Sequence, residues 1–212
     1  MTHETMTVHQ ALCELKVLNK RVASAICETK PISTKEHSSR KVDGVTEAEF
    51  TEQAKASHNS AVDLINRQIA IKAAVSQYNS EKVITVAGKN YTVAQAIWMM
   101  QYGVKEKKSL LTRYTDMLRI ASNTIERENG QRLNDRAESF TVSMCGNKDK
   151  ADPKAYNESL EEYKKNHALE LVDPMGIRKI ISDMEKEISE FETGVDAAIQ
   201  VANATTTLEI SY

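Results

Sequence analysis

The chain has few of the residues that turn-rich folds require. Its 212 residues include 7 glycines, 3 prolines and only 5% aromatic residues, which argues against a β-sandwich or β-barrel with many tight turns. It also lacks a run of about 18 apolar residues of the kind that spans a membrane. The first seven residues are polar and do not contain the apolar centre of a signal peptide. These absences predict a cytoplasmic protein without a membrane partner.

Motifs for metal binding and catalysis are also missing. Cys13, Cys27 and Cys145 form no C-x-x-C pair and leave an odd thiol, which favours a reducing compartment. The five histidines are scattered without metal-ligand spacing, and there is no G-x-S-x-G nucleophile elbow and no phosphate-binding glycine loop. The many glutamates lie among other helix charges and are best explained as a solvated face. We therefore predict no metal, no cofactor and no enzymatic activity.

The charges are nearly balanced, with 28 Lys and Arg against 30 Asp and Glu and a formal net charge of -2. Such a balance gives no general attraction to nucleic acid or to an anionic membrane. The basic residues after position 110 alternate with acidic ones, which largely cancels any stripe that could follow a phosphate backbone. Nucleic acid is not an expected partner.

What the sequence has in abundance is helical periodicity. Apolar residues recur at spacings of three and four in residues 8–26, 50–78, 97–125 and 177–202, which is typical of helices with coiled-coil-like seams. Two capping boxes, Thr46 with Glu49 and Thr92 with Gln95, mark helix starts. The first helix should run from about 7 to 27, and the longest from 93 to about 140. Asp-Pro pairs at 152–153 and 173–174 should open a short charged helix and the last helix.

Strand signals are few. Residues 83–86 and 89–92 are two short β-prone runs around Ala87-Gly88, which predicts a hairpin with a type I turn and Gly88 in the left-handed conformation. Residues 205–212 alternate and predict a C-terminal strand that could pair with this hairpin. Two polar stretches, 28–45 and 145–175, are expected to be excursions from the helices.

Together these patterns predict a mainly α fold. We expect a single helical domain over residues 1–212, a long antiparallel coiled-coil-like helical bundle with one small β-hairpin and a C-terminal strand. Seams this regular can equally be covered by another subunit, so a homo-oligomer is expected.

The seams are interrupted by polar residues on the two helices that flank the hairpin. Gln68, beside Arg67, and Lys107 occupy positions that should be apolar. If these helices are antiparallel neighbours, cations, amides and aromatic residues gather on one flank, a mixture suited to an anionic, planar ligand such as a nucleotide. The alternative is that the cations extend from a wet interface and pair with nearby glutamates. The candidate ligand-binding residues are Asn66, Arg67, Lys89, Tyr91, Trp98, Lys105, Lys107, Lys108 and Arg113.

Several short segments occur in the same order in a known family. They are Val8-His9-Gln10-Ala11-Leu12, Leu64-Ile65-Asn66-Arg67, the hairpin with Tyr91-Thr92-Val93-Ala94-Gln95-Ala96-Ile97, and Val201-Ala202-Asn203-Ala204-Thr205. In these segments, which lie at the two ends and in the middle of the chain, the sequence resembles the uncharacterised septicolysin-like helical proteins of bacteria, phages and prophages. The resemblance implies a helical, oligomeric, phage-associated accessory protein and brings no established activity with it.

Three classes of function follow. The first is a non-enzymatic phage-type homo-oligomer in the host cytoplasm that sequesters a nucleotide-like ligand and so counters host defence signalling. The second is a structural or assembly protein of a phage particle that uses its helices for association. An enzyme ranks last, because no catalytic constellation is present.

Overall fold

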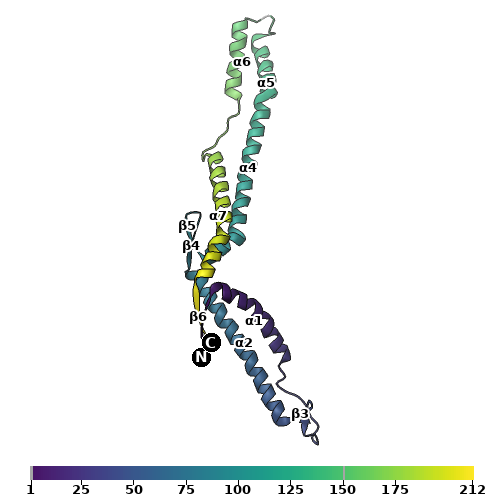
Figure 1. The fold of residues 1–212 in the computed structure, drawn as a ribbon. Helices are drawn as coiled ribbons and strands as arrows, with labels where there is room; N and C mark the ends of the chain where they lie inside the picture. Colours follow the sequence, from purple (N-terminus) through teal and green to yellow (C-terminus); the bar gives the residue numbers. More distant parts are fainter. Residues whose placement is uncertain (1, 150) are drawn as a thin grey trace. The chain divides into compact units, whose positions relative to one another are not determined.

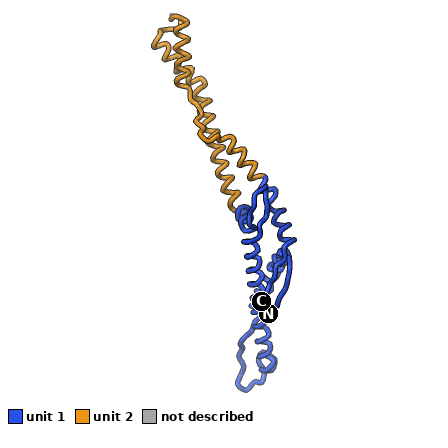
Figure 2. Tube along the Cα trace, turned by 90° about the vertical axis from the view of Figure 1, so that its left-hand side faces the viewer, with its two compact units in different colours: residues 1–101, 190–212 blue, residues 102–189 orange. Residues whose placement is uncertain are grey.

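The computed structural model describes residues 2–149 and 151–212, and these residues form two compact units (Figure 2). Unit 1 contains the described residues up to Gln101 together with Glu190–Tyr212, and unit 2 lies within Tyr102–Ser189. Helices dominate both units, so the predicted mainly α fold is confirmed. The expected single helical domain over residues 1–212 stays a prediction.

Two long antiparallel helices form the frame of unit 1. They are α1 (Val8–Glu28) and α2 (Glu47–Glu81), which pack against each other along their seams (Figure 1). The short helix α3 (Val93–Trp98) and the second half of α7 (Ile177–Thr205) complete the unit.

Capping boxes begin three of these helices. The predicted boxes at Thr46 and Thr92 are confirmed, since each threonine side chain accepts a hydrogen bond from a backbone N–H three residues later. A third box, in which Thr7 and Gln10 bond reciprocally, begins α1 and was not predicted.

The two chain ends form a small sheet. Strand β6 (Thr207–Ser211) confirms the predicted C-terminal strand. The prediction that it could pair with the hairpin was wrong, because β6 pairs antiparallel with β1 (His3–Thr7) at the other end of the chain. Leu208 and Ile210 of β6 are buried where the strand packs on α2. The pairing continues into the start of α1, because the Val8 N–H donates to the Thr206 carbonyl at 3.0 Å.

The hairpin is where the sequence placed it, with β4 (Val83–Val86) paired to β5 (Lys89–Thr92). The predicted turn type was wrong, because Ala87 (φ 51°) and Gly88 (φ 74°) both adopt positive φ values. This is the geometry of a type I′ turn, whose twist matches that of the flanking strands in a two-residue loop.

A second, smaller hairpin lies in the segment predicted as a polar excursion. Strands β2 (Lys41–Val42) and β3 (Val45–Thr46) pair around Asp43 and Gly44, which have φ values of 51° and 86°. Asp-Gly is among the strongest short-range hairpin signals, and the prediction missed it.

The core of unit 1 lies where the helices, the strand pairs and α7 meet. Its almost fully buried side chains come from α1, α2, α3, α7, β4 and β6. They include Val8, Ala11, Leu18, Ile71, Val93, Ala96, Val195 and Ile210. All nine predicted seam positions of α2, from Phe50 to Tyr78, are buried or half-buried.

Unit 2 is an antiparallel helical hairpin. One arm consists of α4 (Val104–Arg127) and α5 (Leu133–Cys145), and α6 (Pro153–His167) and the first part of α7 return alongside it (Figure 1). The arms are joined at their ends by a stack in which the rings of Phe140 and Tyr163 lie 4.8 Å apart.

The helix predicted from 93 to about 140 is subdivided. Two π-helical segments, η1 (Met99–Gly103) and η2 (Glu128–Arg132), interrupt it, and Gly130 leaves the helical conformation with ψ at -130°. A residue without Cβ relaxes the backbone at this kink.

The second polar excursion also differs in detail from the prediction. Helix α6 begins after the predicted Asp152 cap but ends at His167 instead of about 171. Helix α7 begins at Ile177, not at Pro174, because Gly176 has a φ of 68°. Asp173 still caps the helix by accepting from the Ile177 N–H at 2.8 Å.

Few side chains of unit 2 are removed from solvent. Among its described residues, the buried apolar side chains are Val104, Leu133, Ala137, Tyr156 and Ile188. The predicted seam of α4, from Leu111 to Ile125, is only half-buried, because a unit two helices thick covers each helix from one side. Coiled-coil winding therefore stays a prediction.

Candidate functional site

Arg67, in the middle of α2, is the centre of a charged cluster that joins both ends of the chain. Its two terminal nitrogens donate to the two carboxylate oxygens of Glu4 at 2.7 Å each, and its Nε donates to Glu14 at 2.5 Å. The same guanidinium donates to the hydroxyl of Tyr212, whose ring centroid lies 5.2 Å from the guanidinium carbon. Strand β1, helix α1 and the C-terminus are thus tied to α2 by one side chain.

The electrostatics of this cluster are those of a satisfied ion-pair network. The hydrogen bond from Arg67 holds the pKa of the Glu4 carboxyl below its usual value, and Glu14 and Glu4 raise the pKa of Arg67. Bidentate pairing to one carboxylate and a further bond to a second leave the guanidinium fork engaged. A free anion would have to displace a carboxylate to bind here.

The residues beside Arg67 have different surroundings. Gln68, the polar residue of the seam, donates to the Asn19 side chain of α1 at 2.5 Å, which satisfies its amide across the helix pair. Asn66 is exposed on α2. The predicted polar interruption of the seam therefore exists, and it is made of contacts between α1 and α2.

The hairpin side of unit 1 contains three further candidates. Tyr91 is half-buried, and its ring meets that of Phe191 edge-on at 5.5 Å. Lys89 in β5 and Trp98 at the end of α3 are exposed, and both make further contacts. Tyr91 therefore packs the hairpin onto α7.

The remaining candidates belong to unit 2. Lys107 pairs with Glu187 of α7 at 2.8 Å, and both side chains are about a third exposed. Lys105, Lys108 and Arg113 are exposed on α4. The nine predicted residues are thus divided between the two units, and their role as a ligand site stays a prediction.

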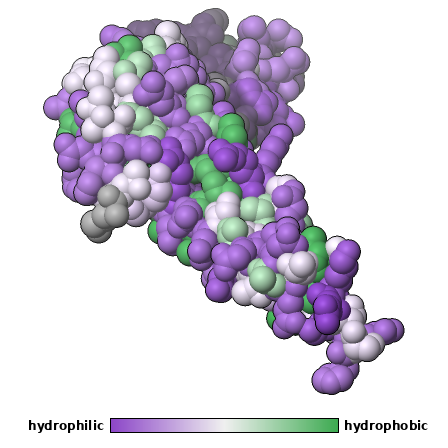
Figure 3. All heavy atoms as spheres, turned by 60° about the horizontal axis from the view of Figure 1, so that its bottom comes forward, coloured by the Kyte–Doolittle hydropathy of each residue, from purple (hydrophilic) through white to green (hydrophobic). Residues whose placement is uncertain are grey.

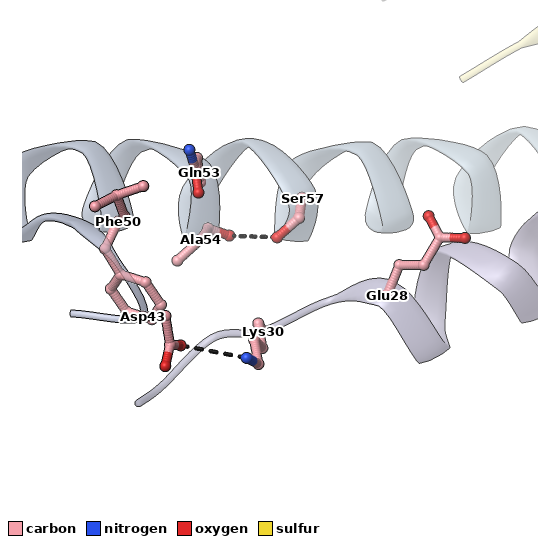
Figure 4. A pocket seen from close by; sticks show the side chains of 8 residues that line it. Glu28, Lys30, Asp43, Phe50, Gln53, Ala54 and Ser57 are labelled. Atoms are coloured by element: carbon pink, nitrogen blue, oxygen red, sulfur yellow. Dashed lines mark hydrogen bonds and ion pairs between the residues drawn. The ribbon is translucent and has the colours of Figure 1, made fainter. Parts of the chain in front are cut away.

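A cavity of about 290 Å³ lies between the end of α1, the β2–β3 hairpin and the start of α2 (Figure 4). Phe50 and Ala54 of α2 face Lys30 and Asp43, which form an ion pair of 3.2 Å. Hydrogen bonds from Ser33 and Lys30 keep the pKa of Asp43 below its usual value. With Glu28 also on its wall, the cavity carries two carboxylates and one lysine, so it disfavours an anion such as a nucleotide.

A larger hollow of about 560 Å³ lies between the end of α2 and strand β6. Tyr78 is buried at its base and donates to the Asn203 side chain at 3.1 Å, and burial raises the pKa of this phenol. Lys82 is the single basic residue on its wall, against Glu81 and Glu209. Neither cavity gathers the cations that an anionic ligand requires.

The His, Cys, Asp and Glu side chains are the residues that could bind a metal ion or act as nucleophiles. Within residues 2–149 and 151–212, no group of three or more His, Cys, Asp or Glu side chains could hold a metal ion. The sulfur of Cys13 lies 3.8 Å from Nε2 of His9, a pair that the four-residue spacing on α1 signals and that the prediction passed over. Both side chains are exposed on the helix surface.

Apolar side chains outside the core are numerous on the long helices. Leu110, Met117 and Ile120 of α4 are exposed, as are Val62 and Ile69 of α2. Figure 3 shows such hydrophobic side chains interrupting the hydrophilic surface. In the described part of the chain, no helix is both long and apolar enough to cross a membrane. The exposed apolar side chains of the long helices are therefore a further candidate site.

Neither a protein-family model nor a curated protein nor a solved structure matches the chain.

Proposed function

We propose that this protein is a non-enzymatic, homo-oligomeric helical protein whose function is structural, with its long helices serving as association surfaces. Its accessible surface carries this proposal. The chain exposes 14845 Å², whereas a compact monomer of its mass exposes about 9,800 Å² and two separate compact domains of the sizes of the units about 11,800 Å² together. The chain thus exposes about 3,000 Å² more than two separate compact domains would.

The nature of this surface supports the same function. Many of the exposed apolar residues lie on helices that already bury one seam, among them Leu110, Met117 and Ile120 of α4, and contiguous exposed apolar faces mark interaction sites. Permanent homomeric interfaces bury about 2,000 to 5,000 Å² counted over both partners, which is about 1,000 to 2,500 Å² of each chain, so the surplus is large enough to supply one. The satisfied Arg67 cluster and the two cavities, neither of which gathers cations, offer less support for ligand binding.

The test is the mass of the purified full-length chain in solution, measured by light scattering during size-exclusion chromatography over a hundredfold range of concentration. We expect a stable multiple of the chain mass at micromolar concentration. A chain that stays monomeric throughout this range would contradict the proposal. The expected place in a phage particle, which rests on the family resemblance, is tested by co-purification with virions.

Sequestration of an anionic, nucleotide-like ligand is the second candidate. It is favoured by Lys105 and Arg113, which are exposed on α4 and have no ion-pair partner among residues 2–149 and 151–212. A ligand that binds only the native state raises the melting temperature. A melting panel of cyclic and ADP-ribose-type nucleotides should show a rise that a Lys105→Ala/Arg113→Ala variant loses. An unchanged melting temperature across the panel would remove this candidate.

A further inference from the structure

Helix α4 carries two apolar stripes, and unit 2 covers only the first. The first is the seam from Leu111 to Ile125, which is half-buried. The second follows another face of α4 through seven residues at alternating spacings of four and three, of which three are apolar. These residues, the second stripe of α4, are Glu106, Leu110, Arg113, Met117, Ile120, Thr124 and Arg127.

The middle of the second stripe is apolar and open to solvent. The exposed fractions of Leu110, Met117 and Ile120 are 44%, 39% and 48%. Six of the seven residues are exposed and Thr124 is half-buried, so the stripe is not part of the packing of unit 2. Glu106 and Arg113 form no ion pair within the described residues, whereas Arg127 pairs with the neighbouring Glu128 at 3.2 Å and stays exposed.

The charges of the second stripe are opposite at its two ends. Glu106 begins it and Arg127 ends it, and the midpoint lies beside Met117. We infer that the second stripe of α4 is a self-complementary surface that binds the same stripe of a second copy in antiparallel orientation. This inference rests on the proposed homo-oligomeric function and names the surface and the geometry of the contact.

A two-fold axis beside Met117 brings opposite charges of the two copies together at both ends of the stripe. It sets Glu106 opposite Arg127 of the second copy, and the same contact recurs on the other side of the axis, as in every isologous interface. Leu110 then lies within one turn of Ile120 of the second copy, and Met117 meets its own counterpart. Arg113 falls opposite Ile120, where its long side chain extends to the solvent-exposed rim.

Other orientations and partners fit less well. A parallel pairing would set Glu106 beside Glu106 and Arg127 beside Arg127, which places like charges together. A membrane surface would have to accept Glu106, Arg113 and Arg127 within the apolar face. Nucleic acid would meet charges of both signs. A second copy in antiparallel orientation satisfies both the apolar centre and the charged ends.

Helix α2 supplies an internal comparison. It also has a second stripe at heptad spacing, which consists of Lys55, His58, Val62, Ile65, Ile69, Lys72 and Ser76. Its charged residues, Lys55 and Lys72, are both basic, so no antiparallel register can set opposite charges of the two copies against each other within this stripe. The stripe of α2 therefore lacks the self-complementarity that distinguishes the stripe of α4.

The test compares one apolar residue of each stripe in the full-length chain. Ile120→Asp on α4 should weaken self-association at least tenfold, because it buries a carboxylate at the apolar centre. Ile69→Asp on α2, where the native side chain is 59% exposed, should leave the dissociation constant unchanged. Sedimentation velocity measures both constants, and circular dichroism checks that each variant is folded. A dissociation constant that Ile120→Asp does not change would overturn the inference.

A charge exchange tests the orientation and does not rely on the apolar residues. Glu106→Arg alone and Arg127→Glu alone should each weaken association about three- to tenfold, since each sets like charges together twice per dimer. The double variant Glu106→Arg/Arg127→Glu should restore it, because the charges are again opposite. Failure of the double variant to recover would exclude the antiparallel contact. If Ile120→Asp does not fold, the charge exchange between positions 106 and 127 tests the antiparallel contact by itself.

The outcomes separate the inference from the proposed function. A wild-type chain that is monomeric at every concentration overturns both. An oligomer that Ile69→Asp dissociates and Ile120→Asp does not overturns the α4 contact and leaves the oligomeric function standing. An odd number of subunits also overturns the inference, because two-fold pairs produce even numbers.

Discussion

Unit 1 and unit 2 contain helices of the same kind but bury them to different degrees. In unit 1, two antiparallel helices are supplemented by the β1–β6 pair, the β4–β5 hairpin and part of α7, so that Leu18, Ile71 and Val195 are almost completely removed from solvent. In unit 2, one helical arm meets another, and the buried apolar side chains among its described residues are Val104, Leu133, Ala137, Tyr156 and Ile188. Two helices in contact shield one face each, and a third element is needed to enclose a core.

The difference shows how stability is divided in this chain. Apolar burial contributes about 25 cal/mol per Å² removed from water, so unit 1 should hold most of the free energy of folding. Unit 2 is left with exposed apolar faces, and association with another copy is the means by which they would be covered. The following predictions test this comparison, from the largest expected effect to the smallest.

Truncation in the core of unit 1 should have the largest effect. Ile71 is completely buried in α2, so Ile71→Ala should lower the free energy of unfolding by about 3 kcal/mol, through lost burial and the cavity left behind. Ile69, two residues away on the same helix, is mostly exposed, and Ile69→Ala should change stability by less than about 0.5 kcal/mol. Urea unfolding measures both. Equal losses in the two variants would contradict the assigned core.

The Arg67 cluster should account for the next effect. Arg67→Met should cost about 2 kcal/mol, because it leaves two carboxylates without their partner. The matched change Arg119→Met in unit 2 removes an exposed pair with Asp116 and should cost less than about 0.5 kcal/mol. Urea unfolding at neutral pH measures the free energy of unfolding of both variants.

This cluster should also respond to acid in a defined direction. Arg67 lowers the folded-state pKa of Glu4 below its ordinary value of 4.5. The contribution of this carboxylate is therefore fully present above pH 4.5 and is lost as the pH falls through the lowered pKa. The stability difference between wild type and Arg67→Met should narrow below pH 4. A difference that stays constant from pH 6 to pH 3 would contradict the assignment.

The smallest effect should be a gain of stability in unit 2. Thr141 of α5 is completely buried, and its hydroxyl has no hydrogen-bond partner among the described residues. Thr141→Val keeps the shape and removes this unsatisfied group, which should stabilise the protein by about 1 kcal/mol. Thr112→Val, where the hydroxyl donates to the Lys108 carbonyl at 2.9 Å, should bring no gain. Thermal unfolding distinguishes the two.

Local signals predicted most of the elements correctly. The threonine caps at 46 and 92, the Asp152-Pro153 helix start and the hairpin at 83–92 depend on neighbouring residues, and the structure contains all of them. The wrong predictions concern residues whose backbone conformation could not be predicted from the spacing of apolar residues. Ala87 accepts a positive φ to fit a two-residue loop, and Gly176 delays the start of α7.

The contacts of the candidate site were harder to predict from local sequence signals. The interrupted seam directed attention to Arg67, but its partners Glu4, Glu14 and Tyr212 lie 53 to 145 positions away in the sequence. Glu14 meets Arg67 because α1 packs on α2, and Glu4 and Tyr212 meet it because β1 pairs with β6, a contact that no local pattern signalled. An arginine that could have bound an anion is thereby engaged in an ion-pair network.

The sequence by itself determined the helices, their caps and the apolar seams, because these depend on spacings of three and four residues and on bonds within one turn. Only the tertiary structure decided which polar residues find partners and which apolar faces stay exposed, since both depend on elements distant in the sequence. The few glycines and prolines predicted long helices. The way those helices pack leaves the second stripe of α4 uncovered.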